Sequence, residues 1–178
     1  MSLFVVVTGM PGSGKSTIGC LVAEALALPF FDKDEVLESL FETLGVGDSS
    51  WRTRMSRAAD EVFKTLVQQS AGAVVVSWWR DSRNESSWGT ETTWLNSLPG
   101  KVVELHCQCT PELAVERFFS RSRHAGHLDN LKSRSEELTK FNRAAALGPL
   151  GVVPVIVCRT ELRQNLPLLI EALNEHAG

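Results

Sequence analysis

The chain has 178 residues, a length that favours a single folded domain. Hydrophobic residues make up 43% of it and charged residues 22%, which excludes a disordered or fibrous protein, and no apolar run reaches the ~20 residues of a membrane span. The formal net charge of −3 gives no overall positive field for nucleic acid or anionic lipid. We therefore expect one domain over residues 1–178, with no nucleic-acid or membrane partner.

The cysteine content and the first residues indicate the cellular compartment of the protein. The four cysteines are too few and too scattered for the disulfide framework of a small secreted domain. They are Cys20, Cys107, Cys109 and Cys158. Residues 1–8 are apolar but lack the basic start of a signal peptide. These features predict a cytoplasmic protein.

Short apolar runs alternate with amphipathic stretches along the whole chain. The runs rich in β-branched residues predict buried strands at residues 3–8, 30–32, 73–77, 102–107 and 153–158. The helical spacing of apolar residues predicts helices at residues 15–28, 34–44, 51–70, 111–122, 131–147 and 162–176. Strands that alternate with helices of this length form βαβ units. The sequence therefore predicts a three-layer α/β fold, with a parallel sheet of about five strands and helices on both faces.

A glycine-rich segment follows the first predicted strand and opens the first predicted helix. Residues 9–16 match the Walker A pattern G-x-x-x-x-G-K-[ST]. Gly12 and Gly14 allow the backbone to curl so that its N–H groups point at a phosphate, and the helix dipole adds to the attraction. In this pattern Lys15 contacts the β- and γ-phosphates and Ser16 binds Mg²⁺. We expect ATP and Mg²⁺ to be held by Gly9, Gly12, Ser13, Gly14, Lys15, Ser16 and Thr17.

The rest of the chain distinguishes between the classes of phosphate-loop (P-loop) protein. The N-K-x-D motif of guanine recognition is absent, and the chain is too short for an AAA+ module with its helical lid domain. The third predicted strand ends at Ser77-Trp78-Trp79, without the acid with which hydrolysing ATPases hold Mg²⁺ and position water. These absences favour a small kinase over a GTPase or a motor.

Two carboxylates stand where the second predicted strand ends. Asp32 and Asp34 are spaced i, i+2, which turns both side chains to one side at the carboxyl edge of a parallel sheet, where ligands bind. One carboxylate can hold the metal while the other accepts a proton from an attacking hydroxyl. We assign Asp32 to the metal and Asp34 to the acceptor as general base. The alternative is that Asp34 only caps the following helix, with Lys33 exposed.

These motifs resemble those of a family of small P-loop kinases. The resemblance rests on the Walker A segment, on residues 31–45, and on residues 121–129, which read Arg-Ser-Arg-His-Ala-Gly-His-Leu-Asp. Over most of its length the chain looks like the small P-loop kinases often labelled AAA-family ATP-binding proteins. That group is related to shikimate kinase, gluconate kinase and chloramphenicol phosphotransferase, and to the polynucleotide kinases and zeta toxins. The resemblance implies the P-loop kinase strand order 2-3-1-4-5, a short mobile lid at about residues 123–130, and ATP-dependent phosphorylation of a small molecule.

The same resemblance matches Asp34 to the family's general base and Asp32 to its metal-associated aspartate. The chain also departs from the family at two places. It has Leu37 and Glu38 where many relatives carry a basic residue, and residues 77–80 replace an acidic or Asn-containing end of the third strand. Both places lie where relatives touch substrate, so the resemblance does not imply which molecule is the acceptor.

Arginines end the fourth predicted helix just before the lid. Arg117 and Arg121 are four residues apart and share a helical face, and Arg123 opens the loop. This layout resembles that of nucleoside-monophosphate kinases, in which one arginine stacks on adenine and later ones reach the γ-phosphate. The resemblance implies Arg117 at the adenine and a catalytic Arg121 at the transferred phosphate, tasks that suit a guanidinium because it stacks on rings and pairs with phosphate oxygens. Arg159, after the last predicted strand, is a further nucleotide-binding candidate. The alternative is a solvated basic helix end.

Four of the five tryptophans fall between residues 78 and 94, in an otherwise polar stretch. We expect Trp78 and Arg80 to line the acceptor pocket, the indole against a sugar or ring and the guanidinium against an anionic group. Trp88 and Trp94 are expected to anchor the segment to the core.

In the predicted lid, His124 and His127 flank Gly126. The spacing of Cys107 and Cys109 upstream does not fit a zinc site with these histidines. A structural or substrate role in the lid and plain exposure to solvent both stay open for the two histidines.

The sequence thus predicts a kinase that phosphorylates a hydroxyl of a sugar-like molecule, a metabolite or an antibiotic, as a monomer or dimer. One alternative is a nucleotide-binding regulatory protein with vestigial chemistry, because the third-strand acid is missing. Another is an end kinase like the polynucleotide kinases, against which the acidic charge balance weighs.

Overall fold

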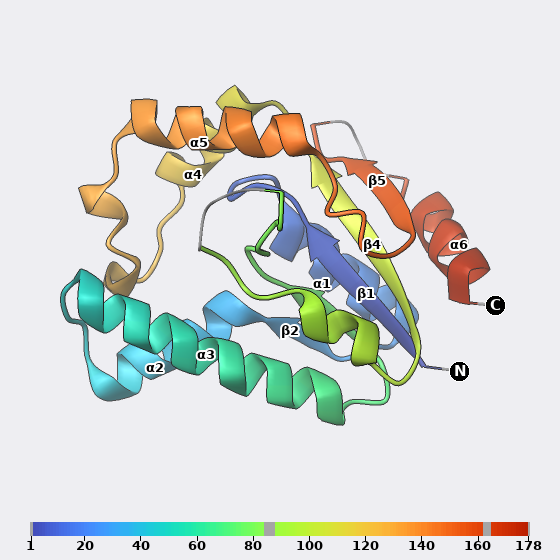
Figure 1. Cartoon of the computed structure of the whole chain (residues 1–178). Helices are drawn as coiled ribbons and strands as arrows, with labels where there is room; N and C mark the ends of the chain where they lie inside the picture. Colours follow the sequence, from blue (N-terminus) through green and yellow to red (C-terminus); the bar gives the residue numbers. More distant parts are fainter. Residues whose placement is uncertain (1, 84–87, 162–164, 178) are drawn as a thin grey trace.

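Five parallel strands form a sheet through the centre of the molecule (Figure 1). The computed structural model describes residues 2–83, 88–161 and 165–177. Its strands are β1 (Leu3–Thr8), β2 (Phe30–Asp32), β3 (Ala73–Val76), β4 (Lys101–Gln108) and β5 (Val155–Arg159). They pair in the order β2-β3-β1-β4-β5, and every pairing is parallel. This confirms the expected fold class and strand order.

Helices cover both faces of the sheet (Figure 1). They are α1 (Lys15–Leu26), α2 (Lys33–Leu44), α3 (Ser49–Gln69), α4 (Pro111–Ser120), α5 (Arg134–Leu147) and α6 (Leu166–Ala177), with the short 3-10 turns η1 (Thr93–Ser97), η2 (Ala125–His127) and η3 (Asp129–Leu131). The fifth predicted helix begins later than expected because η3 occupies its first residues and Ser133 caps α5. The expected start of the last helix at residue 162 lies outside the described residues. Within the described part of the chain, no helix has the length and apolar character needed to cross a bilayer.

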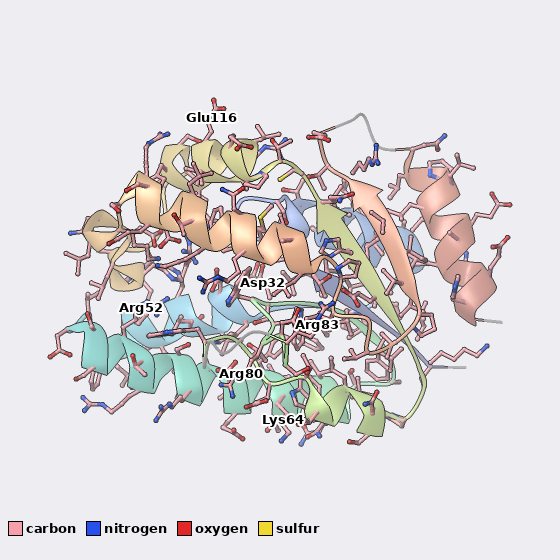
Figure 2. All side chains as sticks on the ribbon, turned by 45° about the horizontal axis from the view of Figure 1, so that its top comes forward. Asp32, Arg52, Lys64, Arg80, Arg83 and Glu116 are labelled. Atoms are coloured by element: carbon pink, nitrogen blue, oxygen red, sulfur yellow. The ribbon has the colours of Figure 1, made fainter. Side chains whose placement is uncertain are left out.

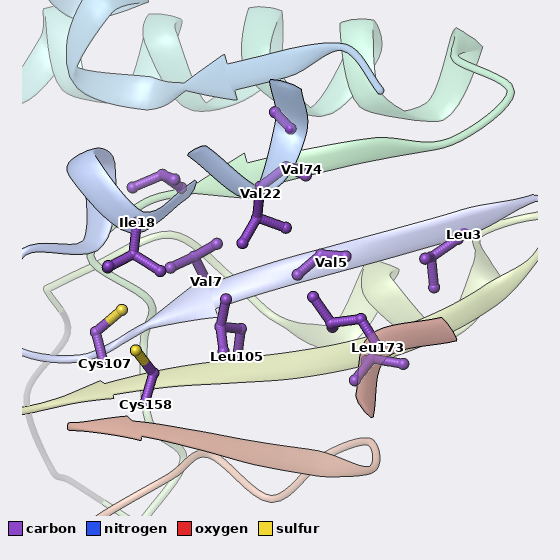
Figure 3. Packing of buried hydrophobic residues seen from close by; sticks show 13 residues of the cluster. Leu3, Val5, Val7, Ile18, Val22, Val74, Leu105, Cys107, Cys158 and Leu173 are labelled. Atoms are coloured by element: carbon purple, nitrogen blue, oxygen red, sulfur yellow. The ribbon is translucent and has the colours of Figure 1, made fainter. Parts of the chain in front are cut away.

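Side chains of β1 alternate between two apolar clusters. Val5 and Val7 pack on one face against Ile18 and Val22 of α1, as Figure 3 shows. Phe4 and Val6 pack on the other face with the helix α3 and the turn η1. Both faces of β1 are therefore buried, which explains why it is a continuous apolar run.

The apolar stripe predicted for α3 is only partly buried. Ala59, Phe63 and Val67 reach the core, whereas Val62 and Leu66 are exposed. The helix lies along α2 and β2 at the edge of the sheet, so its buried face is narrower than the sequence pattern suggested.

A buried carboxylate in β4 ties the sheet to the chain just before β5. Glu104 is fully buried, and its Oε1 accepts hydrogen bonds from the Thr8 hydroxyl at 2.6 Å and from the Leu150 N–H at 2.8 Å. Its Oε2 accepts from the Gly151 N–H at 2.8 Å. Because both carboxylate oxygens receive hydrogen bonds, the buried charge is compensated inside the fold.

Replacing Glu104 with Gln is expected to lower the free energy of unfolding by about 2–3 kcal/mol, because an amide NH₂ would face groups that are themselves donors. Urea denaturation would measure the change. Glu116→Gln is the matched control, since Glu116 is exposed on α4 (Figure 2). Equal stability of the two variants would contradict the structural role of Glu104.

Candidate active site

The Walker A segment forms a tight loop between β1 and α1, and its glycines are required by the packing. Gly12 has φ +81°, and a Cβ there would lie 2.2 Å from the backbone oxygen of Ala114 in α4. Lys15 folds back so that its Nζ donates to the carbonyl oxygens of Gly9 and Met10, each at 2.8 Å. The buried hydroxyl of Ser13 has no hydrogen-bond partner among the described residues. The loop thus holds a cation and an unsatisfied polar group at the place predicted for phosphates.

Burial lowers the pKa of Lys15 to about 8. A bound triphosphate would raise that pKa again, because a nearby negative charge favours the charged amine. Near pH 8 nucleotide binding is therefore expected to take up about half a proton, and affinity should fall as the pH rises through 8. Calorimetry of MgATP binding in two buffers with different ionisation enthalpies would measure the uptake. Lys15 should contribute none at pH 6.5, and equal uptake at both pH values would contradict the assignment.

Asp32 joins the P-loop to the start of α2. Its Oδ2 accepts a hydrogen bond from the Ser16 hydroxyl at 2.5 Å, and its Oδ1 accepts from the backbone N–H of Asp34 at 2.9 Å. Asp32 is therefore the N-cap of α2, so the alternative in which Asp34 is the cap is wrong. Burial raises the pKa of Asp32, an effect that the Ser16 hydrogen bond opposes. The pair offers two oxygen ligands at the phosphate loop.

Lys33 is buried, contrary to the alternative that left it exposed. Its Nζ donates to the Ser56 hydroxyl at 2.8 Å and lies 3.1 Å from the Asp60 carboxylate, both on α3. Asp60 in turn accepts a hydrogen bond from Thr90 at 2.6 Å. This network fixes the start of α2 on α3 and leaves the Asp34 side chain to face the lid.

Asp34 lies in the first turn of α2, where its carboxylate forms an ion pair with Arg123 of the lid. Desolvation acts to raise its pKa, but positive charges, first that of Arg123 and also that of Lys15, outweigh it, so the pKa of Asp34 is lowered. The carboxylate is half exposed and stays ionised at neutral pH. Asp34 thus has an accessible negative charge within electrostatic range of the P-loop lysine.

Two further arginines belong to the same charged group. Burial first, and then the charge of Arg123, lower the pKa of both Arg121 and Arg52, while Asp34 acts on each in the opposite direction. Arg52 lies near the start of α3 (Figure 2), and its Nε is buried without a hydrogen-bond partner in the described structure. Arg52 was missed from the sequence. Arg121 lies over the Phe118 ring, 5.0 Å from its centroid, and within electrostatic range of Asp34 and Asp32.

Arg117 points to the opposite end of the loop. It donates to the backbone oxygen and hydroxyl of Thr160 at 3.3 and 3.5 Å, and the Thr160 hydroxyl donates to the Ser13 carbonyl at 2.6 Å. Thr160 follows Arg159, which ends β5. Arg117 and Arg121 therefore diverge where α4 ends, and the contact of Arg117 or Arg159 with adenine stays a prediction.

A cavity of about 90 Å³ lies at the carboxyl ends of β1, β3 and β4. Trp78, Trp88 and His106 line it, together with Gly9 and Met10 at the start of the P-loop. It therefore adjoins the start of the P-loop. His106 hydrogen-bonds with the Thr8 hydroxyl through Nδ1 at 2.9 Å, and burial lowers the pKa of its ring.

The tryptophan segment is only partly as expected. Trp94 is buried in the core, but Trp88 is 61% exposed at the cavity, so its predicted anchoring is wrong. Trp79 is the second anchor, with its indole N–H donating to the Val7 carbonyl at 2.9 Å. Arg80 pairs with Glu91 and does not line the cavity, so its geometry does not support the predicted contact with the acceptor.

Comparison with known proteins places this site in a family. The family model for shikimate kinase matches residues 11–76. A curated shikimate kinase from Paracidovorax citrulli is 53% identical over 150 residues, which cover 78% of this chain and 76% of that protein. The chain belongs to the shikimate kinase family. The family match begins inside the P-loop and extends to the end of β3, so it includes Asp32, Asp34 and Arg52.

The other matches are shorter or more distant. The chain spans 46%, 61% and 47% of the length of the first three curated shikimate kinases that it matches. A crystal structure from Chloroflexus aurantiacus has a TM-score of 0.76 at 23% identity, covering 99% of this chain and 98% of that one. A shikimate kinase structure from Bacteroides thetaiotaomicron has a TM-score of 0.58 at 18% identity, covering 97% of both chains. At these identities the structures show a shared fold.

Proposed function

We propose that the protein is an ATP-dependent kinase that transfers the γ-phosphoryl group to a hydroxyl of a small molecule. The observation that carries the proposal is the placement of Asp34. Its carboxylate is half exposed, lies within electrostatic range of the P-loop lysine, and has an ionised form favoured by Arg123 and Lys15. Nucleotide binding alone does not need this second aspartate, whereas a hydroxyl acceptor needs a base within reach.

The residues of the loop suit MgATP. The unpaired Ser13 hydroxyl and the Lys15 amine are polar groups that phosphate oxygens would satisfy. Mg²⁺ prefers oxygen ligands and keeps several from water and phosphate, so Ser16 and Asp32 suffice as its protein ligands. When bound, the ion neutralises charge that develops on the phosphates.

The acceptor is expected to be a hydroxylated molecule with an anionic group. Asp34 would orient its hydroxyl and take the proton late in the transfer. Arg52 and Arg123 would pair with the anion, because Arg123 contacts Asp34 and Arg52 lies within electrostatic range of it. The relatives that share this family name act by name on shikimate, which is therefore the first acceptor to test. The four reduced cysteines fit the proposed cytoplasmic location.

The proposal is tested by incubating the protein with ATP labelled at the γ-phosphate and with shikimate, then with a low-mass metabolite extract. Chromatography would separate labelled products. We expect a labelled small molecule that depends on Asp34. If MgATP binds but no label moves to any molecule, the regulatory alternative with vestigial chemistry is favoured instead.

A further inference from the structure

The η2 turn of the lid is built around one aromatic side chain of α2. The ring of His124 stacks on Phe41, with centroids 5.4 Å apart and planes at 19°. His127 meets the same ring edge-on, with centroids 5.7 Å apart. Between them, a Cβ added to Gly126 would lie 2.4 Å from the Phe41 ring, so the backbone itself touches it. The lid is therefore seated on α2.

The two histidines that contact Phe41 differ in burial. His127 is fully buried, and its Nε2 lies 2.7 Å from Oε1 of Glu38. His124 lies 3.3 Å from a carboxylate oxygen of Glu42, which is 74% exposed. An exposed ion pair contributes little, whereas losing one partner of a buried hydrogen bond leaves the other unsatisfied. The His127–Glu38 contact is thus the stronger attachment.

The hydrogen bond of His127 fits a neutral ring. Burial and then the charge of Arg123 lower the pKa of His127, so its Nε2 proton can be donated to Glu38 without a buried positive charge. Nδ1 is buried and has no hydrogen-bond partner within the described ranges. Apart from its ring contact with Phe41, His127 is therefore held through Nε2.

The same two elements carry a second contact, one helical turn away. Asp34 and Glu38 are four residues apart on α2, so they lie on one face. Arg123 and His127 meet them in the same order, Arg123 on Asp34 and His127 on Glu38. Arg123 is 13% exposed, and its other terminal nitrogen lies 3.2 Å from Asp129. With only three residues between Arg123 and His127, fixing one limits the position of the other.

We propose that His127 is a positioning residue: its hydrogen bond to Glu38 and its contact with Phe41 fix the lid on α2 and so hold the Arg123 guanidinium on Asp34. The lid is then fixed to α2, the helix that carries Asp34, before any nucleotide binds. Only the importance given to Asp34 rests on the proposed function. The contacts of His124, Gly126 and His127 with Phe41 do not depend on it.

The test compares His127→Phe with His124→Phe in the full chain without nucleotide. Both variants keep an aromatic ring on Phe41, but only the first removes a hydrogen bond to α2. His124→Phe removes the contact with exposed Glu42 and the cap within the lid, in which His124 Nδ1 accepts from the Gly126 N–H at 3.1 Å. NMR would follow backbone amide exchange over residues 123–132 and the Nε–H signal of Arg123, assigned with Arg123→Lys. We expect lid exchange to become at least about tenfold faster in His127→Phe, with loss of the ordered Arg123 signal. In His124→Phe the Arg123 signal should stay, and exchange should change by less than about twofold at every lid amide except Gly126, whose N–H loses its cap.

A second pair of variants covers the case in which Phe is not accommodated at position 127. Glu38→Ala should release the lid as His127→Phe does, whereas Glu42→Ala should not. His127→Gln, whose amide can donate near the position of Nε2, should restore the Arg123 signal at least in part. An Arg123 signal that survives in both His127→Phe and Glu38→Ala would overturn the proposal, as would equal acceleration in the amides of β1. Neither outcome involves phosphoryl transfer, so the proposed function is tested separately.

Discussion

Asp34→Asn is expected to reduce phosphoryl transfer to the acceptor by about 10²–10⁴-fold while MgATP binds with nearly unchanged affinity. The amide keeps the shape of the side chain but cannot take the proton of the hydroxyl. The pair proposed to bind Mg²⁺ is left intact, because Ser16 and Asp32 contact each other and not the Asp34 side chain. Single-turnover kinetics and calorimetry would measure the two quantities separately.

The matched control is Asp48→Asn. Asp48 also stands at a helix start, where its carboxylate caps α3, but it is exposed and has no contact with the P-loop or lid among the described residues. Normal turnover in Asp34→Asn, or a parallel loss in Asp48→Asn, would show that Asp34 is not the base. Loss of MgATP affinity in Asp34→Asn would instead assign Asp34 to the nucleotide.

Lys15→Met is expected to lower phosphoryl transfer by at least about 10²-fold and to weaken MgATP binding. The variant lacks the positive charge that would stabilise the negative charge developing on the phosphates. The fold should survive. In the nucleotide-free protein the Lys15 amine donates to the carbonyls of the loop itself, and removing a buried charge relieves desolvation. Thermal unfolding should therefore occur at or above the wild-type midpoint in the absence of nucleotide.

Lys64→Met provides the comparison for this variant. Lys64 lies on α3 well away from Asp32 and the loop (Figure 2), and should tolerate the change in both activity and binding. Wild-type MgATP affinity in Lys15→Met would refute the role given to the loop lysine.

The fold and the phosphate loop were predictable because their signals are local. A continuous apolar run has to be buried on both faces, and the spacing of Gly12, Gly14 and Lys15 has one well-known structural use. Asp32 was placed correctly beside Ser16 because a strand end in a parallel sheet points its polar residues at the loop. The strand order, in contrast, came from family resemblance and not from periodicity.

The acceptor side of the site was less predictable, because tertiary packing builds it. Arg52 is one of several charged residues near the start of an amphipathic helix, and no local pattern separates it from its neighbours. Its position near Arg123 and Asp34 follows only from the approach of the lid to α3. Trp88 was misjudged as an anchor, since it is exposed. The partner of Arg80, Glu91, lies across a loop, and no local pattern predicts that pair. Glu104 did carry a signal, as an acid between the apolar residues Val103 and Leu105 of a strand.

Met10 gives the phosphate loop an attachment outside the sheet. It is buried in one apolar cluster with Phe118 of α4 and Phe141 of α5, which is separate from the clusters on the two faces of the sheet. The two helices that carry the lid are therefore anchored at their base to the loop that would grip the nucleotide. A swing of α4 and α5 would pull Met10 out of that cluster, so a movement of the lid that leaves the cluster intact is confined to the stretch between Ser120 and Arg134. Such a movement would also have to break the contacts of Arg123 and His127 with α2.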